Sequence, residues 1–287
     1  MKITDIIKIN RPSLSFEVFP PKTSDKYESV SATVNEIAKL SPSYMSVTYG
    51  AGGGTNAYTA KIASEVSSLG VTCLAHLSCI SSTKEQVDSQ LTQLKNLNIK
   101  NILALRGDIP ANLDKTTLDF SYAYQLVDII KKAGDFCIGG ACYPEKHPES
   151  ENVEKDIEYI KIKVDHGCEF LTTQMFFDNY VFYKFIENLR KHRIHVPIVA
   201  GIMPITSLSQ IDKMITLSGT ELPNKFLNMI DKYKDDPISL KNAGIEYAST
   251  QAREIYSNGF NAVHIYTMNK YDVAHTIQND LKDIIEC

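Results

Sequence analysis

Long hydrophobic segments are absent from this chain of 287 residues, and their absence excludes several classes of protein. No apolar run approaches the roughly 20 residues that a membrane-spanning helix needs. Residues 1–10 also lack the apolar stretch of a secretory signal peptide, so we expect a cytoplasmic protein without a membrane partner. The net charge is only −4, from 30 basic and 34 acidic side chains, so the chain offers no broad basic surface for nucleic acid.

Paired metal-binding and disulfide motifs are also missing. The six cysteines contain no Cys-x-x-Cys pair, which predicts reduced, buried thiols at Cys73, Cys79, Cys137, Cys142, Cys168 and Cys287. His76 has no second histidine or carboxylate at metal spacing, so we expect no metal site. The chain has neither the Gly-x-Gly-x-x-Gly fingerprint nor the lysine of a P-loop, which argues against a Rossmann or nucleotide-triphosphate site.

Strand-like apolar runs alternate with helical periodicity along nearly the whole chain. The eight predicted strands cover residues 14–19, 44–48, 71–77, 102–105, 137–142, 170–175, 198–203 and 262–266. Helical spacing of apolar residues lies between them at 26–40, 55–69, 83–97, 122–133, 152–166 and 180–192. This alternation, at this length, predicts a (β/α)8 TIM barrel as a single domain over residues 1–287, with a doubly wound open sheet as the alternative.

The longest connection lies between the seventh and eighth predicted strands, at about residues 206–258. Its length predicts more than one helix in this crossover. Pro223 suits the first turn of a helix, and Asp235-Asp236-Pro237 is typical of a turn.

Arg106, Gly107 and Asp108 directly follow the fourth predicted strand. In an α/β barrel the loops after the strands build the active site, so these side chains are candidate functional residues. Gly107 also lets the backbone turn sharply or approach a ligand. The alternative is that Arg106 and Asp108 only pair with each other at the edge of a loop.

Glu17 interrupts the first predicted strand, which Pro20 and Pro21 then terminate. A carboxyl that lines a barrel is desolvated, and desolvation raises its pKa toward the range of a general acid. The alternative is a structural pair between Glu17 and an internal lysine or arginine.

Polar groups follow other strands as well. The second strand continues into a glycine-rich loop at 50–54, whose backbone amides can approach a planar ring or a phosphate. Gln174 stands beside Met175, Phe176 and Phe177 and can hold a heterocycle through its donor and acceptor. These strand ends predict a site for a large, flat, partly anionic organic ligand.

Seven segments, in order along the chain, together resemble methylenetetrahydrofolate reductase of the bacterial type. They are FEVFPPK at 16–22, SVTYG at 46–50, HLSC at 76–79, LRGD at 105–108, YPEKHPE at 143–149, TQMFFD at 173–178 and GIMP at 201–204. The resemblance runs from about Ser13 to Lys270 and covers nearly the whole chain. It also supports the barrel, because this family has that fold.

The resemblance implies an FAD-dependent oxidoreductase of one-carbon metabolism. NADH or NADPH would reduce the flavin, and the reduced flavin would convert 5,10-methylenetetrahydrofolate to 5-methyltetrahydrofolate in a ping-pong mechanism, for methionine synthesis. The partners are then small molecules, and a homo-oligomer is expected because family members are often dimers or tetramers. The chain ends soon after the barrel, so we expect neither the C-terminal regulatory domain of eukaryotic members nor inhibition by S-adenosylmethionine through it.

Residue by residue, the resemblance assigns catalytic roles to Glu17 and Asp108. Glu17 matches the general acid that protonates a folate nitrogen, and Asp108 matches a carboxylate near both flavin and folate. Cofactor-binding positions are Thr48, Tyr49, Ala51, His76, Arg106, Gly107, Asp108, Tyr143, His147, Asp156 and Lys163. Substrate-binding positions are Gln174, Gln210 and Lys270.

Two positions depart from the family pattern. Lys270 stands where bacterial members commonly have an arginine that contacts folate, and a lysine supplies a point charge in place of a two-pronged donor. Met214 stands where an aromatic residue often stacks on the adenine of a folded dinucleotide.

Two alternatives to this function remain. The same folate reduction can be driven by reduced ferredoxin or a partner subunit, which a test with NADH or NADPH alone would distinguish. The chain can also be a flavin- or folate-binding protein without catalysis. The presence of both Glu17 and Asp108 argues against that alternative, because simple binding does not need a buried acid.

Overall fold

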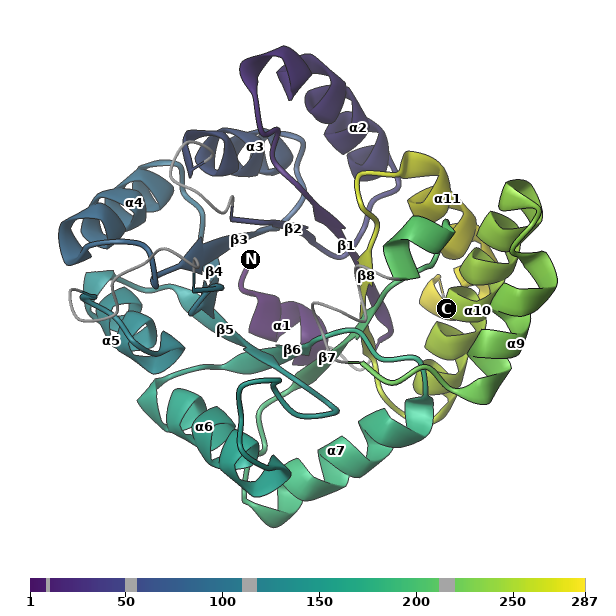
Figure 1. The fold of residues 1–287 in the computed structure, drawn as a ribbon. Helices are drawn as coiled ribbons and strands as arrows, with labels where there is room; N and C mark the ends of the chain where they lie inside the picture. Colours follow the sequence, from purple (N-terminus) through teal and green to yellow (C-terminus); the bar gives the residue numbers. More distant parts are fainter. Residues whose placement is uncertain (9–10, 50–55, 110–117, 212–219, 287) are drawn as a thin grey trace.

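A closed barrel of eight parallel strands forms the centre of the molecule (Figure 1). The computed structural model describes residues 1–8, 11–49, 56–109, 118–211 and 220–286. Each strand pairs with its neighbours in sequence, and the first pairs with the last, which confirms the TIM barrel and excludes the open sheet. The strands are β1 (Ser13–Val18), β2 (Met45–Val47), β3 (Cys73–Ser78), β4 (Asn101–Leu105), β5 (Cys137–Cys142), β6 (Phe170–Thr173), β7 (Ile198–Ile202) and β8 (Ala262–Tyr266).

Helices cover the outside of the barrel, and the six between the first seven strands follow the predicted segments within one residue at each end. The principal ones are α2 (Tyr27–Lys39), α3 (Asn56–Ser68), α4 (Lys84–Asn96), α5 (Ala123–Ala133), α6 (Val153–His166), α7 (Asn179–Lys191), α9 (Asn224–Tyr233), α10 (Pro237–Ser257) and α11 (Tyr271–Asp280). Shorter ones are α1 (Ile3–Lys8), α12 (Lys282–Ile285) and a 3-10 turn at Ser24–Lys26. No helix in the described part of the chain is long and apolar enough to cross a membrane.

Burial on both faces explains why the strands are nearly continuous apolar runs. Along β1, Leu14, Phe16 and Val18 belong to the large core between the barrel and its helices. Ser15 and Glu17 alternate with them, so they take the inner face of the barrel. The same alternation on the other strands points every second side chain into the barrel, where alternate strands supply each interior layer.

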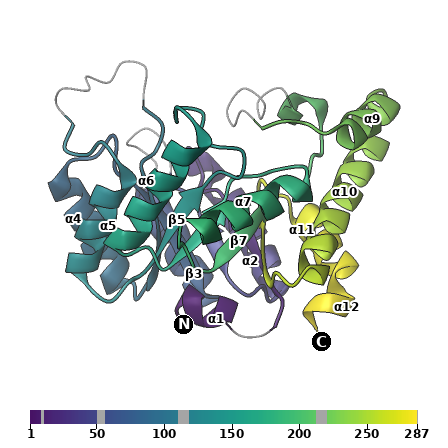
Figure 2. The ribbon, with the colours of Figure 1, turned by 90° about the horizontal axis from the view of Figure 1, so that it is seen from below.

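Helix α1 closes the end of the barrel opposite the loops that follow the strands (Figures 1 and 2). Its Ile3, Ile6 and Ile7 form one cluster with interior residues of the barrel such as Leu103 and Phe170. This helix was not predicted from the sequence, because it is only one and a half turns long. Because α1 fills this end, the interior is accessible from the other end alone.

Polar caps start several helices directly after the strands. Thr83 forms a capping box with Gln86 at α4, and Asp178 accepts the Tyr180 amide at α7. Asp178 is therefore a helix cap within the TQMFFD segment.

The long crossover contains α9 and α10, as the sequence predicts, and Pro223 and Pro237 lie at the starts of these two helices. Pro223 is the residue before α9, and Pro237 opens α10 after its cap Asp236. The predicted turn is present between the two helices: the Asp236 N–H donates to the Tyr233 carbonyl at 3.0 Å around Lys234 and Asp235. Pro237 then begins α10, because proline fits the first turn, where no backbone donor is needed.

Candidate active site

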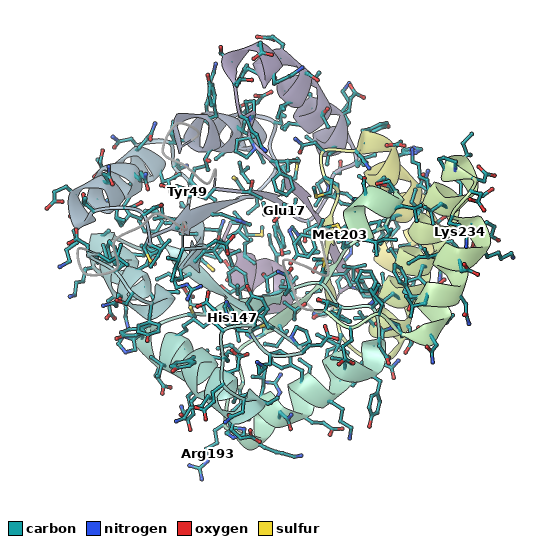
Figure 3. The ribbon with its side chains drawn as sticks, in the orientation of Figure 1. Glu17, Tyr49, His147, Arg193, Met203 and Lys234 are labelled. Atoms are coloured by element: carbon teal, nitrogen blue, oxygen red, sulfur yellow. The ribbon has the colours of Figure 1, made fainter. Side chains whose placement is uncertain are left out.

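A cavity of about 530 Å3 opens at the carboxyl ends of the strands. Figure 3 shows Glu17 near the barrel axis, with Tyr49, His147 and Met203 around it, whereas Arg193 and Lys234 lie at the periphery. Most of the predicted site residues line this cavity: Glu17, Thr48, Tyr49, His76, Arg106, Gly107, Asp108, Tyr143, His147, Lys163 and Gln174. The barrel therefore brings residues from most of its strand ends to one site.

Glu17 lies at the base of the cavity and is only 6% exposed. Ser46 Oγ is 3.5 Å from its Oε2 atom, and His76 Nε2 is 3.7 Å from the same oxygen. Within the described residues no lysine or arginine pairs with it, so the predicted structural ion pair is wrong. Burial raises the pKa of Glu17 to about 8, against a smaller lowering by Ser46, so the carboxyl is largely protonated at neutral pH.

Two buried histidines, His76 and His264, line the same cavity as Glu17. Burial lowers the pKa of His76 and of His264 to about 3, so both imidazoles are neutral. Tyr266, also in the cavity wall, donates its hydroxyl proton to the Thr173 carbonyl at 2.5 Å. Glu17 and the two histidines therefore give the inner part of the cavity polar groups without a formal charge at neutral pH.

Arg106 makes a two-pronged ion pair with Glu149 across the mouth of the cavity. Its two terminal nitrogens lie 2.5 and 2.7 Å from the carboxylate oxygens. The alternative in which Arg106 and Asp108 pair only with each other is therefore wrong, and Asp108 is exposed at the rim. Gly107 has a φ of +85°, and a Cβ there would lie 2.1 Å from Ser78 Oγ, so only glycine fits.

Tyr143, His147 and Lys163 line one side of the cavity. The rings of Tyr143 and His147 meet edge to face at 4.6 Å. His147 Nδ1 accepts the Glu149 amide at 3.1 Å, so a neutral His147 carries its proton on Nε2. Desolvation lowers the pKa of His147, which favours that neutral form, and Lys163 Nζ donates to the Ala141 carbonyl.

Three predicted residues do not line the cavity. Asp156 is buried at the start of α6 and accepts a 2.7 Å hydrogen bond from Ser150. Lys270 and Gln210 meet at Thr206, whose hydroxyl donates to Gln210 Oε1 at 2.7 Å and accepts from Lys270 Nζ. Thus Thr206 joins the two predicted substrate-binding side chains into one group.

Two predicted positions, Ala51 and Met214, lie outside the described residues. Of the remaining positions, Tyr49 accepts a 2.7 Å hydrogen bond from Gln90, and the Thr48 carbonyl accepts from Thr59. The described residues contain no group of three potential ligands for a metal ion.

The sequence reading gave no role to Ser15, Ser46, His264 or Tyr266, although all belong to the barrel interior around the cavity. The sequence nevertheless contains a pattern that indicates their position. In the eighth strand His264 and Tyr266 alternate with Val263 and Ile265, and in the first strand Ser15 and Glu17 alternate with Leu14 and Phe16. This period of two places the polar residues of each strand on its inner face.

The fold and the site define a class of protein: a TIM-barrel enzyme with a neutral acid at the base of an organic ligand site. Comparison with known families narrows this class. The sequence model of the methylenetetrahydrofolate reductase family matches residues 2–282. The chain belongs to this family, and it is therefore a folate-linked oxidoreductase.

Curated relatives agree with this assignment. The chain is 35% identical to the 5,10-methylenetetrahydrofolate reductase of Buchnera aphidicola and 32% identical to that of Escherichia coli, over 93% and 94% of its length and 91% and 90% of theirs. It is also 35% identical to methylenetetrahydrofolate reductase (NADH) 1 of Arabidopsis thaliana, over 94% of its own length. It spans only 49% of that plant protein.

A solved structure shares the fold at low sequence identity. A protein from Clostridium thermocellum, described as binding two copies of 5-methyl-5,6,7,8-tetrahydrofolic acid, aligns with a TM-score of 0.68 at 14% identity. The alignment covers 99% of this chain and all of that one. At this identity the likeness concerns the fold alone.

Proposed function

We propose that the chain catalyses the FAD-dependent reduction of 5,10-methylenetetrahydrofolate to 5-methyltetrahydrofolate, with NADH or NADPH as the electron donor. The observation that carries the proposal is Glu17, a protonated carboxyl at the base of a cavity of organic-ligand size. Family membership supplies the substrate class, and relatives named for NADH support the donor.

The chemistry of the cavity wall fits a flavin dinucleotide. The Nε2–H of His147, whose Nδ1 already accepts the Glu149 amide, and the ammonium of Lys163 offer donors suited to a diphosphate. Gly107, where no side chain fits, lets the backbone approach a flat ring closely. Tyr49 and Tyr143 add aromatic surface to the same wall. When bound, FAD would supply the redox chemistry, accepting a hydride from the nicotinamide and later giving one to the folate.

Glu17 would act as the general acid toward the folate. Its carboxyl holds a proton at neutral pH because burial disfavours the charged form, and it lies at the base of the cavity where the pterin would enter. Transfer of that proton to a folate nitrogen opens the bridging ring to a cationic iminium. The negative charge of Asp108 at the rim would favour this cation.

The remaining assigned residues would position substrate. Gln174 lines the cavity, and its Oε1 accepts the Met175 amide at 3.0 Å, which turns its NH2 group away from that amide and toward a ligand. Lys270, joined to Gln210 through Thr206, presents a cation suited to a carboxylate of the folate tail. Because each substrate would use the same face of the flavin in turn, ping-pong kinetics follow.

The biological setting extends the same proposal. The product would feed methionine synthesis, and the protein would work in the cytoplasm on small molecules. It would do so as a homo-oligomer.

Cofactor content and donor preference test the proposal. The purified protein should release FAD, about one per chain, and its absorbance should bleach when NADH or NADPH is added without oxygen. If the bound flavin bleaches only with reduced ferredoxin or an added partner, that reductant is the electron donor in place of the nicotinamide. Absence of flavin after expression with added riboflavin, together with failure to bind added FAD, would contradict the proposal.

A further inference from the structure

A charged contact joins two loops at the mouth of the cavity. Arg106, directly after β4, holds the carboxylate of Glu149, in the loop between β5 and α6, through both of its terminal nitrogens at 2.5 and 2.7 Å. A two-pronged contact of this kind fixes the direction of a carboxylate as well as its distance, which the single ammonium of a lysine does not do. The position of Glu149 is therefore set by a residue outside its own loop.

The backbone of Glu149 also contacts the ring of His147, which lines the cavity (Figure 3). The Glu149 N–H donates to His147 Nδ1 at 3.1 Å. Because a backbone N–H can only donate, Nδ1 carries a lone pair, and the one proton of the neutral ring lies on Nε2. Desolvation lowers the pKa of His147, in agreement with a neutral ring. Nε2–H is therefore the only N–H donor of this imidazole.

Other hydrogen bonds within this loop hold its backbone. The Ser150 N–H donates to the His147 carbonyl at 2.9 Å, and Lys146 Nζ donates to the Ser150 carbonyl at 2.6 Å. Lys146 has a φ of +86°, in the left-handed region, and a residue with a side chain keeps such a conformation only where surrounding contacts fix it. These bonds hold the backbone of His147, whereas the Glu149 N–H reaches the ring itself.

We propose that Glu149 is a positioning residue for His147: Arg106 holds its carboxylate, and its backbone N–H thereby keeps the imidazole with the proton on Nε2, as a donor to an anionic group of the cofactor. Glu149 acts through His147 and not through its own charge, which would repel an anion. The role toward the cofactor rests on the proposed function, in which His147 binds the FAD diphosphate.

The charged and titratable groups around His147 belong to its own loop, to the end of β4 and to α6: Tyr143, Glu149, Arg106, Asp156 and Lys163. After desolvation, which lowers the pKa of His147 most, the two cations lower it further and the two carboxylates raise it. An imidazole nitrogen has one lone pair, and the Glu149 N–H uses that of Nδ1. The neighbouring groups therefore do not replace this bond.

Nitrogen NMR reads the tautomer in the purified full-length protein, whether or not flavin is bound. Loss of a pair of ring signals in His147→Gln identifies His147, and in the wild type its two nitrogens should show the widely separated shifts of a fixed Nε2–H tautomer. In Glu149→Ala the two shifts should move toward each other, because the ring then exchanges between tautomers. Unchanged shifts in Glu149→Ala would overturn the proposal.

Glu151→Ala is the matched control, because it removes an exposed carboxylate from the same loop and leaves the Arg106–Glu149 pair intact. It should leave the His147 shifts unchanged. Arg106→Lys keeps the positive charge but loses the two-pronged contact, so it should move the shifts in the same direction as Glu149→Ala. If Glu149→Ala fails to fold, Arg106→Lys decides in its place, and unchanged shifts there would contradict the proposal.

The rate at which the holoenzyme releases FAD measures the effect on the cofactor. Glu149→Ala should release FAD about tenfold faster on dilution, followed by flavin fluorescence, because a fixed hydrogen-bond donor to the diphosphate is lost. Charge alone predicts the opposite, since removing a carboxylate and releasing Arg106 near a diphosphate would slow the release. Slower or unchanged release would therefore overturn the proposal, and Glu151→Ala should alter the rate by less than about twofold.

A double variant shows whether Glu149 acts through His147. In the His147→Gln background, Glu149→Ala should cause no further acceleration of FAD release, because the ring that it positions is gone. Equal effects in the two backgrounds would show that Glu149 acts by another route and would overturn the proposal. A protein that binds no FAD would contradict the proposed function, and the NMR result would still decide whether Glu149 positions His147.

Discussion

Glu17 shows how burial alone converts an ordinary carboxyl into an acid usable at neutral pH. The strand alternation that sends Leu14 and Phe16 to the outer core sends Glu17 inward, where its carboxyl accepts a 3.5 Å hydrogen bond from Ser46. Desolvation outweighs that contact, so the pKa rises to about 8. The raised pKa of Glu17 therefore depends on the buried side chains around it. Loss of the Glu17 proton should slow the folate half-reaction and leave the nicotinamide half-reaction nearly unchanged.

Replacing Glu17 by Gln should leave flavin reduction by the nicotinamide nearly unchanged. Folate reduction should fall by roughly two orders of magnitude or more, because the amide cannot donate an acidic proton. Stopped-flow absorbance measures the two half-reactions separately. Glu36→Gln, at an exposed pair with Lys39, is the matched control, and an equal loss in both half-reactions would remove Glu17 from the general-acid role.

Replacing Lys270 by Ala should raise the KM for methylenetetrahydrofolate about tenfold, because the half-buried cation that we propose binds the substrate carboxylate is lost. Steady-state kinetics measures the KM, and flavin absorbance checks cofactor content. Lys234→Ala, which removes an exposed cation paired with Asp231, should leave the KM unchanged. Loss of flavin in Lys270→Ala would show that this lysine has a structural role instead.

At the scale of single elements, hydrogen bonds from Asn101, at the start of β4, hold α1 in position. The Asn101 amide accepts the Ile3 backbone N–H at 2.9 Å and donates to the carbonyls of Met1 and Cys73, both at 3.1 Å. Asn101 is 2% exposed, so water cannot replace these bonds. This residue links the floor of the barrel to two strands.

Asn101→Ala should therefore lower the free energy of unfolding by about 2–3 kcal/mol, since buried backbone groups lose their partners. Urea unfolding followed by circular dichroism measures the change. Lys2→Ala, which breaks an exposed pair with Asp135, should change it by less than about 0.5 kcal/mol. A loss in Asn101→Ala as small as in this control would show that α1 is held by its apolar contacts alone.

The strands and the helices between the first seven of them were predictable from sequence because their apolar periodicity is strong and their ends carry Gly, Pro or caps. Helix α1 was missed because six residues show too little periodicity. Glu17, Arg106 and Gln174 could be selected as strand-end polar residues, whereas Arg106–Glu149 and Lys270–Thr206–Gln210 join segments far apart in sequence. Such partners depend on tertiary distances that no local pattern encodes.

At the scale of the whole molecule, the interior ionisable groups make stability depend on pH. Glu17 has a folded pKa of about 8, above its ordinary 4.5, so the folded state binds the extra proton and stability falls as pH rises between these values. His76 and His264 have folded pKa values of about 3, below their ordinary 6.5, so their contribution is lost as pH falls from 6.5 toward 3. The folded state is therefore destabilised by Glu17 as the pH rises and by the two histidines as the pH falls.

Glu17→Gln should therefore gain stability relative to the wild type as pH rises from 5 to 8. The gain should be about 3 kcal/mol at most, because the amide has no proton to lose. Urea midpoints at several pH values measure it, with Glu36→Gln as the exposed control. A constant difference between Glu17→Gln and wild type across this range would show that Glu17 is already charged in the folded protein.

The most direct test of the central claim is an anaerobic cycle followed by flavin absorbance. NADH or NADPH is added to the purified protein until the flavin bleaches, and methylenetetrahydrofolate is then added without oxygen. We predict that the absorbance returns as one 5-methyltetrahydrofolate forms per flavin, and that Glu17→Gln bleaches but does not recover at a comparable rate. A reduced flavin that methylenetetrahydrofolate cannot reoxidise in the wild type would contradict the account.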